Sequence, residues 1–311
     1  MKRWDLIVVG AGVAGLTAGI YGARSGLETL VLEEKIPGGA TAEAPLIENY
    51  PGFPKGTSGM DLTRRLVEHA ERMGATIHQL EKVITLDLKA KEKRVKTDKA
   101  VYTTTALILA SGSHYRTLGI PGEEELRGRG VSYCAVCDGA FFKGGRVMVV
   151  GGGNSAGVSA IYLSNLASNV KLAHRRDQLR AEEALVKNLR NRNVEIMLNT
   201  EIKEIRGNGK VKTIVFFNNK TGNIGELEVD GVFVQVGEIP NSQVAQEAGI
   251  KVDGDGYIII DGRQRTNLEG VYAAGDVTTC PVKQVGTAVG QAIIAATEAF
   301  GYIKRPYYYK D

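Results

Sequence analysis

The chain has 311 residues, of which 43% are apolar, and its 39 basic side chains outnumber its 35 acidic ones to give a net charge of +4. That length suffices for two domains with separate cores, and no apolar run approaches the roughly 18 residues of a spanning helix. The modest net charge argues against a nucleic-acid or membrane partner. Glycines interrupt the first apolar segment, which argues against a secretory signal. With only three cysteines, we expect a cytoplasmic protein.

Residues 4–34 predict a strand, a tight turn, a helix of small residues and a second strand. The turn and the helix start comprise Gly10, Gly12, Val13, Ala14 and Gly15. The first glycine permits the turn, the second lets the backbone approach a pyrophosphate, and the third allows close helix–strand packing. Glu33 ends the second strand and can accept hydrogen bonds from a ribose diol, which favours FAD at this unit.

Two segments follow before the cysteine pair. The most basic stretch, "KAKEKRVKTDK" at 89–99, predicts a solvated hairpin between strands. The strand "ALILASGS" at 106–113 ends in small residues, including Ala110 and Gly112, and resembles the place where a chain passes beneath a flavin; the alternative is an ordinary strand and its turn.

The stretch "GVSYCAVCDGAFF" at 130–142 places Cys134 and Cys137 three positions apart. A metal clip, a structural disulfide and a redox couple are the possibilities. A zinc site is disfavoured because Cys280 and the four histidines are isolated and provide no second pair of ligands. A structural disulfide is disfavoured because a bridge over two residues constrains the unfolded chain little. A redox couple is therefore favoured. Asp138 would then donate and accept protons; the alternative is an acidic helix cap.

Residues 145–176 repeat the first pattern, with Gly151, Gly153 and Ala156 at the fingerprint positions and Asn154 and Ser155 at the helix start. In both copies the second strand closes 23 residues after the first glycine. The second copy ends without an acid, in cationic residues: His174, Arg175, Arg176 and Arg180. Guanidinium groups grip a 2′-phosphate, which a carboxylate would repel, so this copy favours NADPH.

A later strand, at 266–277, runs into Gly275 and Asp276, a turn that can direct a carboxylate at a ribityl or phosphate group. The FAD-type pattern thus opens and closes the chain around the NADPH-type pattern. We expect an α/β fold of two Rossmann-like dinucleotide-binding domains, the NADPH domain (115–242, with the cysteine pair) inserted into an FAD domain (1–114 and 243–311). The two Gly- and Pro-containing crossings would form a hinge.

The segments "RGVSYCAVCDGAFF", "VVGGGNSA", "HRRDQLRAEE" and "VYAAGDV", in this order, resemble the low-molecular-weight thioredoxin reductases, prokaryotic-type FAD/NADPH pyridine nucleotide-disulfide oxidoreductases. The resemblance runs from Asp5 to about Ala299 and includes the flavin-side loop at 38–53. It implies an NADPH-dependent thioredoxin-disulfide reductase, homodimeric, whose partner is thioredoxin or a thioredoxin-like protein. It also implies that the inserted domain rotates to present first nicotinamide and then the dithiol to the flavin.

The resemblance assigns roles residue by residue. Cys137 would lie beside the flavin, Cys134 would attack the partner disulfide, and Asp138 would be the acid and base. The residues expected to line FAD are Gly10, Gly12, Val13, Ala14, Gly15, Glu33, Gly39, Ala40, Asn49, Val83, Ala110, Gly112, Gly275, Asp276, Gln284 and Val285. Those expected to hold NADPH are Gly153, Asn154, Ser155, Ala156, His174, Arg175, Arg176, Arg180 and Gly237.

Three positions depart from the family's common pattern: Ala40 replaces a frequent glutamine, Lys283 an arginine, and Ser159 a glutamate. Two other functions stay open: a flavin reductase on the same scaffold that uses ferredoxin, a deazaflavin or oxygen, and a non-catalytic redox sensor. We expect Cys280 to be a buried or semi-buried thiol. The segment 305–311 predicts a C-terminal tail, whose three tyrosines could also cover a dimer edge.

Overall fold

The computed structural model describes residues 2–44 and 46–305, so the tyrosines of the expected tail lie outside the described residues. The chain divides into two compact units. The first contains the residues up to His114 and those from Ile239 onward, and the second runs from Tyr115 to Glu238, a few residues short of the expected boundary at 242. Within the described ranges, no helix is long and apolar enough to cross a membrane.

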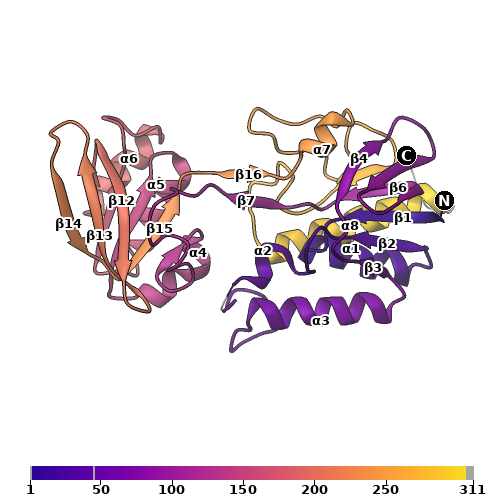
Figure 1. Ribbon diagram of the computed structural model, residues 1–311, viewed down its shortest axis with the longest axis horizontal. Coiled ribbons are helices and arrows are strands. Elements are labelled where there is room, and N and C mark those ends of the chain that lie inside the picture. The colour runs from indigo at the N-terminus through magenta and orange to yellow at the C-terminus, as the bar shows by residue number, and fades with distance from the viewer. Residues whose placement is uncertain (1, 45, 306–311) are drawn as a thin grey trace. The chain divides into compact units, whose positions relative to one another are not determined.

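The first unit is built on a seven-stranded sheet in the order β3-β2-β1-β6-β5-β4, with β17 also paired to β6. The strands are β1 Lys2–Val9, β2 Thr29–Leu32, β3 Thr76–His78, β4 Val83–Asp87, β5 Lys93–Thr97, β6 Val101–Leu109 and β17 Val271–Ala273. Pairing is parallel from β3 to β6 and to β17, and antiparallel from β6 through β5 to β4. The carboxyl ends of the parallel strands therefore meet at one edge of the sheet (Figure 1).

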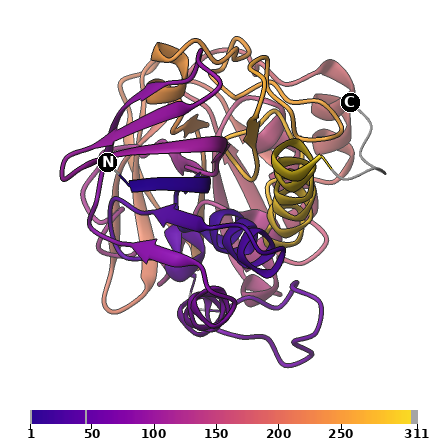
Figure 2. The same ribbon diagram turned by 90° about the vertical axis from the view of Figure 1, so that its right-hand side faces the viewer.

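The helices of this unit, within the residues that the structure describes, are α1 Val13–Arg24, α2 Gly39–Ala42, α3 Gly59–Arg72, α7 Gln243–Glu247 and α8 Val285–Lys304. Helix α1 packs against both α8 and α3, and Figure 2 shows α8 in yellow, viewed along its axis. The buried face of α8 is almost entirely alanine, including Ala288, Ala292, Ala295 and Ala299. Small side chains let the two helix backbones approach closely, which fixes α8 beside the start of α1.

The second unit combines a parallel and an antiparallel sheet. The parallel sheet has the order β11-β10-β9-β15-β8, and β12, β13 and β14 form the antiparallel one. Its strands are β8 Val131–Ser132, β9 Arg146–Gly151, β10 Asn169–Ala173, β11 Glu195–Met197, β12 Thr200–Gly207, β13 Val211–Asn218, β14 Ile224–Glu228 and β15 Gly231–Gln235. Its helices are α4 Ala135–Asp138, η1 Gly139–Phe142, α5 Asn154–Leu163 and α6 Glu183–Asn191.

The chain passes between the units twice, and the two crossings run side by side. Strands β7 Ser113–Tyr115 and β16 Glu238–Pro240 pair with each other in a two-stranded ladder. The sequence pattern of strand, turn, helix and strand is present in both units, as β1-α1-β2 and β9-α5-β10.

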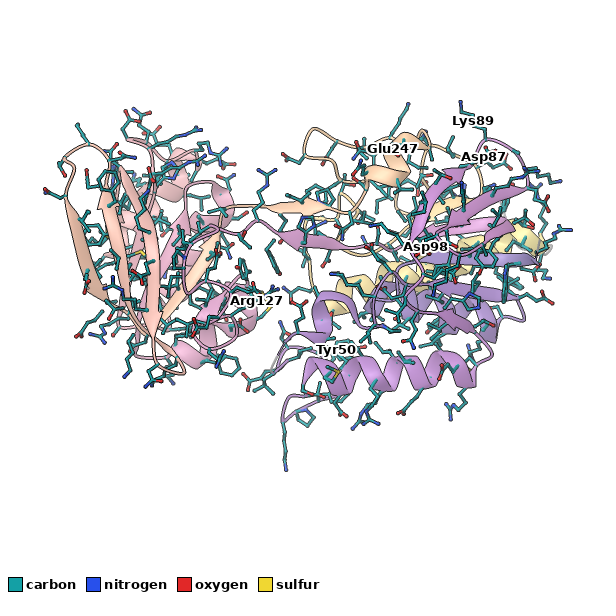
Figure 3. All side chains as sticks on the ribbon, in the orientation of Figure 1. Tyr50, Asp87, Lys89, Asp98, Arg127 and Glu247 are labelled. Atoms are coloured by element: carbon teal, nitrogen blue, oxygen red, sulfur yellow. A yellow bond between two sulfur atoms is a disulfide. The ribbon has the colours of Figure 1, made fainter. Side chains whose placement is uncertain are left out.

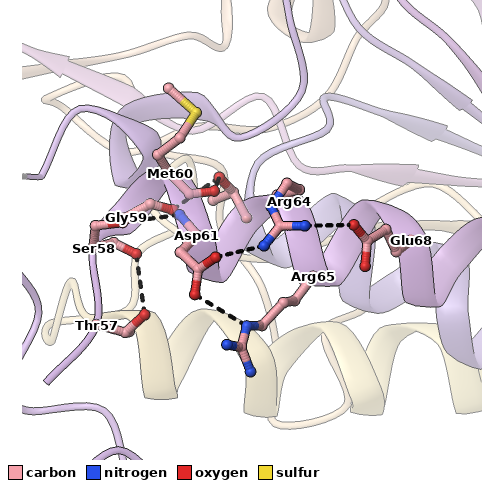
Figure 4. Close-up of polar contacts among 9 residues, drawn as sticks. Thr57, Ser58, Gly59, Met60, Asp61, Arg64, Arg65 and Glu68 are labelled. Carbon is pink, nitrogen blue, oxygen red and sulfur yellow. Dashed lines mark hydrogen bonds and ion pairs between the residues drawn. The ribbon is translucent and has the colours of Figure 1, made fainter. Parts of the chain in front are cut away.

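Helix α3 shows how local sequence sets a helix end (Figure 4). Ser58 is the N-cap, and its hydroxyl accepts a hydrogen bond from the backbone N–H of Asp61 at 3.1 Å. The Asp61 carboxylate pairs with Arg64 at 2.7 Å and with Arg65 at 3.1 Å, while Arg64 also reaches Glu68. The hydrogen bond from Arg64 lowers the pKa of Asp61 most. An acid in the first turn and a capped amide together favour the helix start.

Replacing Ser58 by alanine should lower the free energy of unfolding by about 1 kcal/mol, because one amide at the start of α3 loses its acceptor. Urea denaturation followed by circular dichroism measures this. The control is Ser25→Ala, at an exposed serine whose side chain has no hydrogen bond in the described structure. Equal midpoints for the two variants would show that the cap contributes nothing.

Candidate active site

The turn between β1 and α1 leaves no room for side chains at Gly10 and Gly15. Gly10 has φ +100°, and a Cβ there would lie 2.4 Å from the carbonyl oxygen of Ala110. A Cβ on Gly15 would lie 1.7 Å from the carbonyl oxygen of Gly10. At Gly12 the space is open, because the nearest atom to a Cβ is the Cα of Gly39 at 4.0 Å. No side chain caps α1, so its first amides can receive a phosphate, and the residues fit a dinucleotide.

Backbone contacts gather other expected residues around this turn. Glu33 accepts hydrogen bonds from the backbone N–H groups of Ala11 at 2.7 Å and Lys35 at 2.9 Å. Each carboxylate oxygen has a second lone pair, which remains for a ribose hydroxyl. The N–H of Gly38 donates to the carbonyl oxygen of Ala11, so the loop that carries Gly39 and Ala40 meets the glycine turn.

Segments distant in sequence complete the same surroundings. The amide of Asn49 donates to the side chain of Gln284 at 3.0 Å, which joins its loop to the start of α8 and to Val285. A Cβ on Gly275 would lie 2.9 Å from that of Ala14. The expected residues Val83, Ala110 and Gly112 lie at the start of β4 and just beyond the end of β6.

Asp276 follows Gly275 and is partly buried. Burial raises the pKa of its carboxyl, while the charge of Lys283 opposes that shift. The Lys283 ammonium donates hydrogen bonds to the carbonyl oxygens of Asp276 and Thr278, so this lysine holds the turn in place.

The second glycine turn repeats the geometry in the other unit. A Cβ on Gly151 would lie 2.3 Å from the carbonyl oxygen of Gln235 and 2.8 Å from the Cβ of Ala156. Gly153, the N-cap of α5, has no atom within 4 Å of its Cβ position and supplies no side-chain cap. The start of α5 therefore also presents free amides to open space, as a pyrophosphate requires. Asn154 exchanges two hydrogen bonds with Glu182, both at 2.9 Å.

The arginines after β10 are exposed, whereas the histidine is not. Arg175, Arg176 and Arg180 are exposed, and the Arg180 backbone N–H donates to the carbonyl oxygen of Gly152 at 2.6 Å, which brings this loop to the glycine turn. His174 is 6% exposed, and a Cβ on Gly152 would lie 2.1 Å from its Nδ1. Burial lowers the pKa of His174, so its ring supports the turn as a neutral group rather than adding charge.

Gly237 lies two residues beyond the end of β15, whose last residue, Gln235, pairs with Gly151 of the second glycine turn. It has φ +111°, and its nearest neighbour is the side chain of Arg116 at 3.7 Å. It therefore follows directly on the strand end that borders the second glycine turn, where the chain enters the crossing strand β16.

Cys134 and Cys137 form a disulfide, with their Cα atoms 5.3 Å apart. Cys134 is the N-cap of α4, and the backbone N–H of Cys137 points at its sulfur at 3.2 Å. Both cysteines are partly buried. When the bond is reduced, an amide directed at the Cys134 sulfur favours its thiolate, the nucleophilic form.

Asp138 is tied to the same segment through Ser132. The Ser132 hydroxyl donates to the Asp138 carboxylate at 2.6 Å and accepts from the backbone N–H of Cys134 at 3.1 Å. Burial raises the pKa of Asp138, and the hydrogen bond from Ser132 opposes that shift. A carboxyl whose pKa is raised, on the segment that carries the two sulfurs, is suited to donate and accept protons in disulfide chemistry.

Residues 4–292 match the family described as pyridine nucleotide-disulphide oxidoreductase. A thioredoxin reductase of Bacillus subtilis (strain 168) is 42% identical over 305 residues, 97% of this chain and 96% of the relative. One of Peptoclostridium acidaminophilum is 42% identical over 308 residues, 97% of each. The crystal structure of thioredoxin reductase from Streptococcus pyogenes MGAS5005 aligns with a TM-score of 0.93 at 39% identity and covers 98% of this chain and 99% of that one.

The chain belongs to the thioredoxin reductases. The expected family and fold class are thereby confirmed. The free thiol Cys280 is partly buried, and no partner cysteine lies near it in the described residues.

Several residues that position the cysteine pair of this thioredoxin reductase were not predicted from its sequence. Ser132 is one, and Gln235 is another, since its amide donates to the carbonyl oxygen of Tyr133 at 2.8 Å. The Tyr133 hydroxyl donates to the buried carboxylate of Glu123 at 2.9 Å. These contacts hold the strand that leads into the cysteines. Only the position of Ser132, two residues before Cys134, gives a signal in the sequence.

Two apolar side chains near the disulfide are open to solvent. Val136 lies between the cysteines and is 51% exposed, and Phe141 is 49% exposed. Exposed apolar groups beside a reactive bond are suited to contact another molecule.

Replacing Ser132 by alanine should raise the pKa of Asp138 further, because the variant loses a hydrogen bond that stabilises the carboxylate. Carbon-13 NMR of the side-chain carboxyls of the oxidised protein, followed against pH, measures the shift. Ser164→Ala is the control, since that hydroxyl donates to the carbonyl oxygen of Ile161 within α5. An unchanged or lowered Asp138 pKa in Ser132→Ala would contradict the assigned contact.

Proposed function

We propose that this chain is an NADPH-dependent thioredoxin reductase that reduces its own Cys134–Cys137 disulfide and passes the electrons to the disulfide of thioredoxin or a thioredoxin-like protein. The observation that carries the proposal is the disulfide on α4, with a protonatable Asp138 held against the same segment by Ser132. The 42% identity to curated thioredoxin reductases over 97% of the chain supports it.

The first unit would hold FAD. The glycine turn and the uncapped start of α1 fit the pyrophosphate, and Glu33 fits the adenosine ribose. Asp276 and the start of α8 would border the rest of the cofactor. When bound, FAD supplies the relay of two electrons between the nicotinamide and the disulfide.

The second unit would hold NADPH. The open space at Gly153 and the free amides of α5 fit its pyrophosphate. Arg175, Arg176 and Arg180 are exposed and would bind the 2′-phosphate by charge-assisted hydrogen bonds. In the proposed reaction, one NADPH and one proton are consumed, and one NADP⁺ is released, for each disulfide that is reduced to two thiols.

At the reduced pair, the Cys134 thiolate would attack one sulfur of the partner disulfide and release the other as a thiolate. The Cys137 thiolate would then displace the partner from the mixed disulfide and re-form the Cys134–Cys137 bond. Asp138 would protonate the departing thiolate and accept a proton from the attacking thiol. The amide of Cys137 favours this order, because it stabilises charge on the Cys134 sulfur.

The partner would dock over exposed Val136 and Phe141, which lie beside the reactive bond. We also propose a homodimer in the cytoplasm. A reducing compartment suits a chain with three cysteines, two of which form a cycling pair.

Cys134→Ser should abolish reduction of thioredoxin while leaving bleaching of the flavin absorbance by NADPH intact, because only transfer to the partner needs this sulfur. Anaerobic titration with NADPH, with thiols counted before and after, measures flavin reduction, and a second assay with oxidised thioredoxin measures transfer to the partner. Cys280→Ser is the control and should gain two thiols per chain as the unaltered protein does. Thioredoxin reduction by Cys134→Ser at the unaltered rate would overturn the assigned role.

Arg176→Ala should raise KM for NADPH roughly 10- to 100-fold and leave KM for NADH unchanged, because only NADPH carries the phosphate that a guanidinium binds. Steady-state kinetics with both donors measures the two values. Arg206→Ala, on β12, is the matched control, since that arginine pairs with Glu204 and Glu226. An equal rise for both donors would contradict a contact with the 2′-phosphate.

A further inference from the structure

A pocket of ≈ 440 Å³ lies in the first unit, where the β4–β5 hairpin meets the end of α8. It is lined by Leu88, Lys89, Ala90, Lys91, Lys93, Thr105, Leu268, Glu269, Tyr302, Ile303 and Arg305. Lys89 projects outward from the turn that joins β4 to β5 (Figure 3). Nothing assigned above to a nucleotide or to the disulfide is among these residues.

The pocket is at the opposite end of the parallel strands from the glycine turn. Glu269 lies just before β17, whereas Gly275 and Asp276 follow it. Arg305 ends α8, whose start lies beside Asn49. A 20-residue helix is about 30 Å long at 1.5 Å per residue, so the two sites are well separated.

Lys93 is the unusual member of this pocket. It occupies an inward position of β5, where buried and exposed residues alternate, and it is 1% exposed. Its ammonium forms no hydrogen bond and no ion pair with any residue that the structure describes. The nitrogen lies 5.7 Å from the centre of the Tyr302 ring, which it faces in a cation–π contact. Burial lowers the pKa of Lys93, and the charge of Glu269 opposes that shift.

A buried ammonium without a hydrogen-bond acceptor is costly for the fold. Gly270, with φ +72°, keeps the surroundings tight, because a Cβ there would lie 3.0 Å from the Lys93 nitrogen and 2.7 Å from the Tyr302 ring. The chain could have placed an apolar residue at this inward position, as it does at Val95 on the same face.

Most of the remaining charges of the pocket are also positive. Lys89, Lys91 and Arg305 add three cations, against the single carboxylate of Glu269. That carboxylate is 77% exposed and lies 3.8 Å from Arg305, so it does not reach inward to pair with Lys93. Tyr302 and Thr105 add hydroxyl groups to the lining. A site with a buried cation, flanking cations and hydroxyls matches a small oxyanion.

We propose that this pocket binds a small oxyanion, a phosphate or a phosphate ester, with Lys93 at its base and Lys89, Lys91 and Arg305 at its mouth. The bound anion supplies the acceptor that the Lys93 ammonium lacks. The site is separate from the nucleotide-binding turns, and its ligand stabilises the hairpin against the end of α8.

Inorganic phosphate is the probe, added to the FAD-loaded full chain in saturating NADP⁺, which keeps Arg175, Arg176 and Arg180 occupied. Potassium chloride holds the ionic strength constant. A ligand that binds only the folded state raises Tm, by about 3 °C or more at tenfold excess over Kd. A Tm independent of phosphate would overturn the proposal.

Lys93→Met tests the residue. Without phosphate this variant should be at least as stable as the unaltered protein, because an apolar side chain replaces an unpaired ammonium. It should lose the rise in Tm with phosphate. Lys96→Met, at an exposed position of the same strand, is the matched control and should keep the rise. A rise in Lys93→Met equal to that of the control would contradict the assigned site.

Glu269→Gln provides a second test that does not alter the buried lysine. Loss of the only carboxylate among the described residues of the lining should lower the Kd for phosphate about threefold. Calorimetric titration measures the constant, again in NADP⁺. An unchanged or weaker affinity would mean that the anion does not bind beside Glu269.

Discussion

The site depends on backbone approaching backbone at two turns. At Gly10 and Gly15, and again at Gly151, an added Cβ would lie within 2.4 Å of a carbonyl oxygen. These contacts bring each helix start directly against the end of its strand, without a side-chain cap. The free amides at α1 and α5 then point into open space, so the same constraint that builds the turn also creates the phosphate site.

The parts of the fold that repeat locally could be predicted from the sequence. Strand, turn, helix and strand follow one another within about 30 residues, so composition and spacing suffice to recognise both copies. Ser132 and Gln235 could not be found that way, because their roles come from contacts made by the fold: a hydroxyl that touches both Cys134 and Asp138, and an amide that reaches across from β15. His174 looked like part of a cationic cluster, yet its ring packs against Gly152.

The basic hairpin at 89–99 is another segment that the sequence predicts only in part. Its strand β5 pairs with β4 and β6, so the predicted hairpin is present. The prediction that it is solvated fails at Lys93, because strand alternation turns this lysine inward while Arg94 and Lys96 remain exposed. Charge composition alone cannot reveal that alternation, since cationic residues stand on both faces of β5, Lys93 inward and Arg94 and Lys96 outward.

Burial shifts the pKa of Asp138 and the pKa of Lys93 in opposite directions. Around Asp138 it raises the pKa of an acid, and the Ser132 hydrogen bond moderates that shift, so a proton can be held or released beside the disulfide. Around Lys93 burial acts on a base and disfavours its charge, and no described hydrogen bond offsets it. In open parallel sheets, ligands bind at the carboxyl ends of the strands. The buried Lys93 ammonium lies at the opposite end of the strands, so those ligands do not explain it. An oxyanion bound in the pocket does, because it would offset the cost of burying the charge.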